Sequence, residues 1–187
     1  MTKQELRKKY KALRSKLSHD EVEDSSIAIA NAILKLPIWG KEYYHVFLSI
    51  LKQKEINTEP ILSILSGKDK HVVLSKSDFE TNSMTHFLLT DSTKIKTNDW
   101  NIPEPVDGIA IASNVIDVVV VPLLAFDSKG HRVGYGKGFY DKFLSECKPE
   151  TIKIGLSFFE AEEKIQDSND TDIALNFCVT PNRTYKF

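Results

Sequence analysis

Cysteine is scarce in this chain, which excludes a fold held together by disulfides. Only Cys147 and Cys178 occur among the 187 residues, and neither belongs to a Cys-x-x-Cys pair. Two isolated cysteines make no disulfide framework. Such a composition is typical of proteins in a reducing compartment, so we expect a cytoplasmic protein.

Long hydrophobic runs are missing as well. The chain starts with a charged amphipathic stretch instead of the apolar run of a signal peptide. Its most apolar segment, residues 115–126, is shorter than the roughly 18 residues needed to span a bilayer, and it is typical of a buried strand. We therefore expect no membrane partner.

The chain also lacks an excess of charge of one sign. The 25 Lys and Arg residues nearly balance the 26 Asp and Glu residues, so no overall field attracts nucleic acid or an anionic surface. Basic residues cluster only between Lys3 and Lys16, as either a solvated helix face or part of a binding surface. The length suits one domain over residues 1–187, which we expect to be a monomer that binds no nucleic acid.

Two helices are predicted at the start of the chain. Thr2 and Glu5 have the spacing of a capping box, and apolar residues then recur at helical intervals. Ser18 and Glu21 repeat the pattern, which predicts a second helix that ends at Pro37.

Strands and short helices are predicted to alternate beyond these two helices. Apolar and β-branched runs predict strands at residues 43–51, 71–75, 85–90, 115–121, 152–158 and 177–180, and helices are predicted after a Thr58 cap and from Phe139. Because residues 115–121 are apolar at nearly every position, they are typical of a central parallel strand. The alternation predicts a layered, Rossmann-like α/β fold whose mostly parallel central sheet is flanked by helices. The least regular stretch, residues 90–114, is predicted to be a lid or binding loop.

A glycine-rich loop is the most informative local feature. Gly134, Gly136 and Gly138 occupy every second position between a strand that ends at Pro122 and a helix that begins near Phe139. Glycines permit positive φ and close approach to a ligand, and successive amides beside a helix N-terminus can bind phosphate. The spacing matches neither a Walker A loop nor a dinucleotide fingerprint. From the residues alone, a structural bend and a phosphate site both remain open.

Charged residues flank this loop in a pattern that suits a polyphosphate. Arg132 and Lys137 supply positive charge. Asp141 falls in the first turn of the following helix, where a carboxylate either stabilises the helix dipole or binds magnesium beside phosphate groups.

Four segments together resemble a known family. The stretch GHRVGYGKGFYDKFL, residues 130–144, resembles the Gly-x-Arg-Leu-Gly-x-Gly-x-Gly-Tyr-Tyr-Asp signature of the 5-formyltetrahydrofolate cyclo-ligase family. KQELR, KEINT and WNIPEP resemble three further family segments, in the right order along nearly the whole chain. The glycine-loop motif is specific, whereas the other three gain weight as an ordered set.

The resemblance implies roles for individual residues. Lys3, Arg7 and Arg132 would contact the ATP phosphates, with Lys3 and Arg132 catalytic, and Asp141 and Asp172 would bind Mg2+, although Asp170 competes with Asp172 for the second position. The ATP-binding loop would comprise Gly134, Tyr135, Gly136, Lys137, Gly138, Phe139 and Tyr140, and its residues 135–139 would also contact the folate.

Two residues outside the loop complete the implied folate site. Glu55 would accept hydrogen bonds from the pterin, although by itself it reads as an exposed charge at a strand end. Trp100 would offer a flat stacking platform, and core packing is its other interpretation. The sequence departs from the family pattern at Leu123, Phe139, Asn57 and Lys54, where glycine, tyrosine, aspartate and proline are usual.

The implied reaction is the ATP- and Mg2+-dependent closure of 5-formyltetrahydrofolate into 5,10-methenyltetrahydrofolate. The folate substrate would be accepted with or without a polyglutamate tail. ATP would phosphorylate the formyl oxygen, the neighbouring amine would attack, and ADP and phosphate would leave. Positioning and charge stabilisation would dominate such catalysis. The five histidines show no metal-ligand spacing and are interpreted as structural. Two alternatives are a small-molecule kinase that uses the same loop and a non-catalytic module that binds RNA or a protein partner.

Overall fold

The computed structural model describes residues 1–169 and 171–187. Its helices are α1 (Lys3–Ser15), α2 (His19–Ile33), α3 (Glu59–Gly67) and α4 (Phe139–Glu146), with the short 3-10 helices η1 (Leu51–Gln53) and η2 (Ser113–Val115). Its strands are β1 (Tyr43–His45), β2 (His71–Asp78), β3 (Ser83–Leu88), β4 (Ile95–Thr97), β5 (Pro103–Pro105), β6 (Val118–Pro122), β7 (Ala125–Phe126), β8 (Arg132–Val133), β9 (Ile152–Leu156), β10 (Phe177–Val179) and β11 (Thr184–Lys186).

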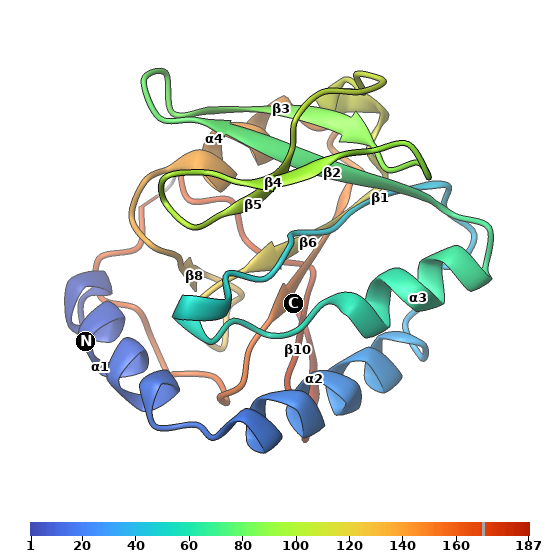
Figure 1. The fold of residues 1–187 in the computed structure, drawn as a ribbon. Coiled ribbons are helices and arrows are strands. Elements are labelled where there is room, and N and C mark those ends of the chain that lie inside the picture. The colour runs from blue at the N-terminus through green and yellow to red at the C-terminus, as the bar shows by residue number, and fades with distance from the viewer. Residues whose placement is uncertain (170) are drawn as a thin grey trace.

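A seven-stranded sheet in the order β11-β10-β9-β6-β1-β2-β3 forms the centre of the molecule (Figure 1). The five strands from β10 to β2 run parallel, and β3 and β11 add antiparallel edges. The mostly parallel α/β sheet is thus confirmed. Val118–Val121 of β6 are buried because both faces of the sheet are covered, as their apolar run predicts.

Helices cover the two faces of the sheet (Figure 1). On one face α2 and α3 pack their apolar side chains against Tyr44 and Val120, and on the other α4 packs Phe143 against Val119 and Val121. Separately, α1 lies against the β7–β8 hairpin. That contact places the basic residues of α1 beside the glycine loop, which directly follows β8. Among the described residues, no helix combines the length and apolar character needed to cross a membrane.

Both predicted capping boxes are present, at Thr2 of α1 and Ser18 of α2. The predicted cap at Thr58 is wrong, although α3 does follow it. The Thr58 hydroxyl instead donates a buried hydrogen bond of 2.7 Å to the carbonyl of Phe47. A contact with a distant segment has therefore replaced the local cap. The second helix also ends earlier than predicted, at Ile33.

The predicted strand over residues 43–51 is too long, because only Tyr43–His45 pair in the sheet. Beyond β1 the chain bonds to the segment before α3, where the Ser49 hydroxyl donates to the Ile56 carbonyl at 2.6 Å. The segment that follows β1 at the carboxyl ends of the central strands carries residues that border a pocket. The central strand is likewise shorter than predicted, since Val115 lies in η2.

Residues 90–114 are more regular than predicted. They contain the antiparallel pair β4 and β5, in which Ile95 lies opposite Pro105. This small sheet is attached to β2, where the Ser77 amide donates to the Glu104 carboxylate at 3.1 Å. A role as a lid or binding loop remains a prediction.

Leu123, where the family usually has glycine, points into the core and not into the pocket. It is buried against β9 directly over Gly155, where an added Cβ would come within 2.6 Å of both Leu123 Cδ2 and Leu175 Cδ1. The bulk gained at residue 123 is thus accommodated by the missing side chain at residue 155.

We expect Gly155→Ala to destabilise the protein by about 1–3 kcal/mol, because an added methyl overpacks this contact. Urea unfolding would measure the change. Gly67→Ala is the matched control, since an added Cβ there meets nothing within 4 Å. Leu123→Ala should partly restore the Gly155→Ala variant, and strict additivity of the two changes would contradict the pairing.

Candidate active site

A pocket of about 350 Å³ lies at the carboxyl ends of β1 and β6. From β1 the chain proceeds to β2 on one side, while β6 adds to the other side, so the two strands flank a topological switch point. Ligands of open α/β sheets bind at such points. Every residue that the sequence assigned to phosphate, folate or metal and that the structure describes lines this pocket.

One end of the pocket carries two ion pairs. The guanidinium of the buried Arg132 donates from Nη2 to Asp141 Oδ1 at 2.6 Å, and its Nη1 contacts the carbonyl of Ile173. Lys3 Nζ lies 2.5 Å from Asp172 Oδ2. The two cations predicted to bind phosphate are therefore each held by a carboxylate predicted to bind metal.

Asp172 is ionised in this arrangement. Burial alone would raise the pKa of its carboxyl, but the amide of Asn169 and the ammonium of Lys3 outweigh burial, so the pKa lies below its usual value. An ionised carboxylate suits a hard cation. The competing candidate, Asp170, lies outside the described residues.

The glycine loop meets α1 through Arg7. The Arg7 Nε donates to the carbonyl of Gly134 at 2.9 Å. Gly136 has a φ of 94°, and a Cβ there would lie 3.2 Å from Arg7 Cζ. Gly138, with a φ of 75°, is the N-cap residue that precedes α4. The positive φ favours glycine at 136, and a side chain there would also crowd the Arg7 guanidinium, so the loop amides and an arginine share this part of the pocket.

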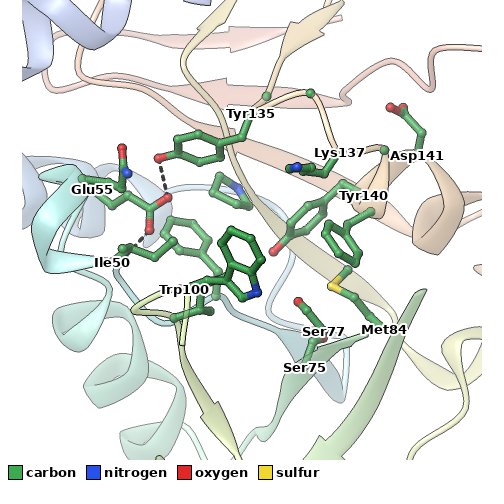
Figure 2. A pocket seen from close by; sticks show the side chains of 18 of the residues that line it. Ile50, Glu55, Ser75, Ser77, Met84, Trp100, Tyr135, Lys137, Tyr140 and Asp141 are labelled. Atoms are coloured by element: carbon green, nitrogen blue, oxygen red, sulfur yellow. Dashed lines mark hydrogen bonds between the residues drawn. The ribbon is translucent and has the colours of Figure 1, made fainter. Parts of the chain in front are cut away.

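The other end of the pocket is formed by Glu55, whose interpretation as an exposed charge is wrong (Figure 2). Its carboxylate accepts hydrogen bonds from the Tyr135 hydroxyl at 2.7 Å and the Ile50 amide at 2.8 Å. Burial raises the pKa of Glu55, and the Ile50 amide, Tyr135 and Arg14 oppose that shift. The result is a buried carboxyl group positioned from two sides.

Arg14 supports this end from behind and was not predicted from the sequence. Its Nη1 donates to the Tyr135 hydroxyl and its Nη2 to the carbonyl of Leu123, both at 2.7 Å. Arg14 follows Arg7 by two helical turns and so lies on the same face of α1. That spacing is the feature of the sequence from which Arg14 could have been predicted to lie near the glycine loop. Arg14 orients Tyr135, which in turn orients Glu55.

An aromatic wall closes one side of the pocket. Trp100, 60% exposed, stacks on Phe79 with ring centroids 5.0 Å apart, and Phe79 meets Phe139 edge to face at 5.1 Å. Core packing is therefore the wrong interpretation of Trp100. Figure 2 shows its indole projecting into the space between Tyr135 and Ser77. Stacking against a ligand remains a prediction, and Phe79 was not foreseen.

Comparison with known proteins decides the family. The model of the 5-formyltetrahydrofolate cyclo-ligase family matches residues 1–181. The chain belongs to this family. It is 27% identical over 203 residues to a probable 5-formyltetrahydrofolate cyclo-ligase of Schizosaccharomyces pombe, covering 100% of this chain and 98% of the relative.

Solved structures support the cyclo-ligase assignment. The fold matches the NMR structure of Aquifex aeolicus 5,10-methenyltetrahydrofolate synthetase with a TM-score of 0.84 and 28% identity, over 100% of this chain and 93% of that one. A 5,10-methenyltetrahydrofolate synthetase from Mycoplasma pneumoniae gives a TM-score of 0.78 at 19% identity, covering 97% of this chain and 99% of that one, and shows the shared fold.

Two departures from the cyclo-ligase pattern have local partners. Asn57 replaces an aspartate and donates its amide to both carboxylate oxygens of Glu23, at 3.0 and 3.2 Å, where a second carboxylate would be repelled. Lys54 replaces a proline and donates to the carbonyls of Ser15 and Leu17 at the end of α1. Cations at a helix C-terminus are favourable. Both changes therefore maintain the loop that carries Glu55.

Proposed function

We propose that this protein is an active 5-formyltetrahydrofolate cyclo-ligase that uses ATP and Mg2+ to form 5,10-methenyltetrahydrofolate. The observation that carries the proposal is one pocket with two chemically different ends. One end gathers Lys3, Arg7 and Arg132 at the glycine loop, and the other presents Glu55 beside an aromatic wall. A polyphosphate suits the first end, and a flat heterocycle with N–H donors suits the second.

The proposed reaction, which the resemblance to the family implies, would use both ends of the pocket. An amide is a poor electrophile, so transfer of the γ-phosphoryl group to the formyl oxygen would create a good leaving group. The amine then attacks the formyl carbon, and phosphate departs. Arg132 and Lys3 stabilise charge on the phosphoryl oxygens during transfer, while Glu55 and the aromatic wall fix the folate. The protein forms no covalent bond to substrate in this scheme.

The residues present fit a magnesium ion bound together with ATP. The described residues contain no group of three or more His, Cys, Asp or Glu side chains that could hold a metal by themselves. Mg2+ is commonly held by one or two carboxylates plus substrate phosphates, and Asp141 and Asp172 border the cationic end of the pocket. When bound, the ion would neutralise charge on the phosphate oxygens.

Asp141→Asn should raise the Mg2+ concentration needed for half-maximal activity by at least roughly tenfold, since even groups that only support metal ligands contribute 10–100-fold. A magnesium titration at saturating ATP would measure the shift. Asp24→Asn changes the same charge on the exposed surface of α2 and serves as the control. An unchanged titration in Asp141→Asn would contradict the assignment.

The proposed function is tested by the near-ultraviolet absorbance of methenyltetrahydrofolate. We expect absorbance to rise when the protein, 5-formyltetrahydrofolate, ATP and Mg2+ are mixed, and not when either ATP or Mg2+ is omitted. A stable phosphoester without free phosphate would instead indicate a kinase. Salt-sensitive RNA binding by a folded protein without ATP turnover would indicate a binding module.

A further inference from the structure

Two histidines interpreted from sequence as structural belong to a hydrogen-bonded row that connects the pocket with the surface. His45 Nε2 and His86 Nδ1 each lie 2.8 Å from the hydroxyl of Ser75. On its far side, His86 Nε2 lies 3.1 Å from the hydroxyl of Ser113, which donates to Glu146 Oε2 at 3.1 Å. His45 and Ser75 line the pocket, and Glu146 is exposed.

The register of the sheet builds this row. Ser75 of β2 lies directly opposite His86 of β3, and β1 places His45 on the other side of β2. All three side chains lie on the face covered by α4, whose Phe143 ring is 4.1 Å from the His86 ring and 4.9 Å from the His45 ring. The same helix supplies Glu146 at its last residue. Rigid elements thus hold every member of the row.

Both imidazoles are neutral near pH 7. Burial, together with the neighbouring His86, lowers the pKa of His45 to about 3. Burial lowers the pKa of His86 to about 4, although Glu146 opposes the shift. A neutral imidazole has one N–H donor and one acceptor nitrogen, and a hydroxyl can donate and accept at once. Each of these groups can therefore receive a proton on one side and release one on the other.

The exposed carboxylate sets the direction of the donors. An ionised Glu146 only accepts, so Ser113 donates to it and His86 Nε2–H donates to Ser113. His86 Nδ1 then accepts from Ser75, and Ser75 accepts from His45 Nε2–H. Among the described residues, His45 Nδ1 is buried without a hydrogen-bond partner. Every hydrogen in the row thus points from the pocket toward the surface.

We propose that Ser75, His86, Ser113 and Glu146 form a proton relay that removes the proton lost by the attacking amine, with His45 as the positioning residue for the Ser75 hydroxyl. This inference rests on the proposed function. Figure 2 shows Ser75 on the pocket wall, on the side away from Glu55 and Tyr135. The relay would therefore serve a step that neither end of the pocket performs.

The amine loses one proton as the ring closes. The amine lone pair forms the new carbon–nitrogen bond, and the amine proton passes to Ser75 Oγ while the Ser75 proton moves to His86 Nδ1. The His86 Nε2 proton moves to Ser113, and the Ser113 proton moves to Glu146 and on to solvent. The phosphate departs with the electron pair of its bond to carbon. An arylamine that has formed this bond is strongly acidic, so weakly basic groups suffice to accept its proton.

Ser75→Ala tests the relay because it interrupts the row and leaves both histidines in place. In a single turnover with rapid quenching, ADP and methenyltetrahydrofolate are counted separately. We expect ADP to form at a near-native rate, ring closure to slow by roughly 10²-fold, and more than one ADP to be released per methenyl product as the trapped intermediate hydrolyses. Ser77→Ala, which removes a pocket hydroxyl from the same strand outside the row, is the comparison. Loss of coupling confined to Ser75→Ala supports the relay.

Glu146→Gln provides a second test at an exposed position that keeps the size of the side chain. Ring closure should slow and become faster with increasing buffer concentration, because buffer bases would replace the lost acceptor. Native closure rates and one ADP per product in both Ser75→Ala and Glu146→Gln would overturn the relay and leave the proposed function intact. Failure of the unmodified protein to form methenyl product would overturn both.

Discussion

Arg132→Ala is expected to lower kcat/KM by roughly 10²–10³-fold or more, the effect of removing one preorganised charge donor from a transition state. Arg132 is buried at the phosphate end of the pocket and is held by Asp141 and the Ile173 carbonyl. Its guanidinium is therefore already oriented before the phosphoryl group transfers. Steady-state formation of methenyltetrahydrofolate would measure the loss, and thermal melting would show whether folding is retained.

Two variants separate the charge of Arg132 from its geometry. Arg132→Lys keeps the charge and loses the planar fork, so we expect it to recover only a small part of the activity. Lys142→Ala removes one positive charge from the exposed side of α4, outside the pocket, and should leave kcat/KM near its native value. Native ATP turnover in a normally melting Arg132→Ala variant would refute the role of Arg132.

Glu55→Gln is expected to raise the KM for 5-formyltetrahydrofolate by roughly 10–10²-fold, because a hydrogen bond to a charged group contributes about 1.5–3 kcal/mol. The KM for ATP should change much less, since Glu55 and Asp141, the carboxylate paired with Arg132, lie on opposite sides of the pocket (Figure 2). Measuring both constants in the same preparation tests whether the two ends act separately. An equal rise in both would contradict the division of the pocket.

The pH dependence of folate binding provides a sharper test of Glu55. Its pKa in the folded protein is raised by burial. As pH falls, Glu55 should therefore become protonated at a higher pH than an exposed glutamate would. Folate affinity should fall over the same pH range. Glu55→Gln should abolish this acid limb. Tyr135→Phe, which removes the hydroxyl that donates to Glu55, should keep the limb and move it further upward.

The contribution of Glu55 to folding stability should change with pH in the opposite direction from folate affinity. A carboxyl with a raised pKa in the folded state favours folding below its unfolded pKa, and that contribution is lost as pH rises through the folded value. Burial of Glu55 thus makes folding less favourable at pH values above its folded pKa. Weak folate binding by Glu55→Gln without a lower melting temperature would separate function from folding.

The sequence was most informative where structure depends on neighbouring residues. The capping boxes at Thr2 and Ser18 formed as predicted because both partners lie three residues apart. The glycine loop was recognised for the same reason, and two of its glycines do have positive φ. The predictions of a Thr58 cap and of a strand through residue 51 were wrong because both segments bond to each other instead. The Thr58 hydroxyl donates to the carbonyl of Phe47, which lies in the segment predicted to be a strand.

The chain by itself determined the α/β class, the apolar central strand, the glycine loop and the acidic and basic residues of the site. Only the tertiary structure decided their pairing. It joined Arg7 to a residue 127 positions away, Tyr135 to Glu55 across 80 positions, and Ser113 to Glu146 across 33. Capping and backbone preferences act within a turn or two of chain, whereas these contacts depend on sheet register and helix packing, which many distant residues set together.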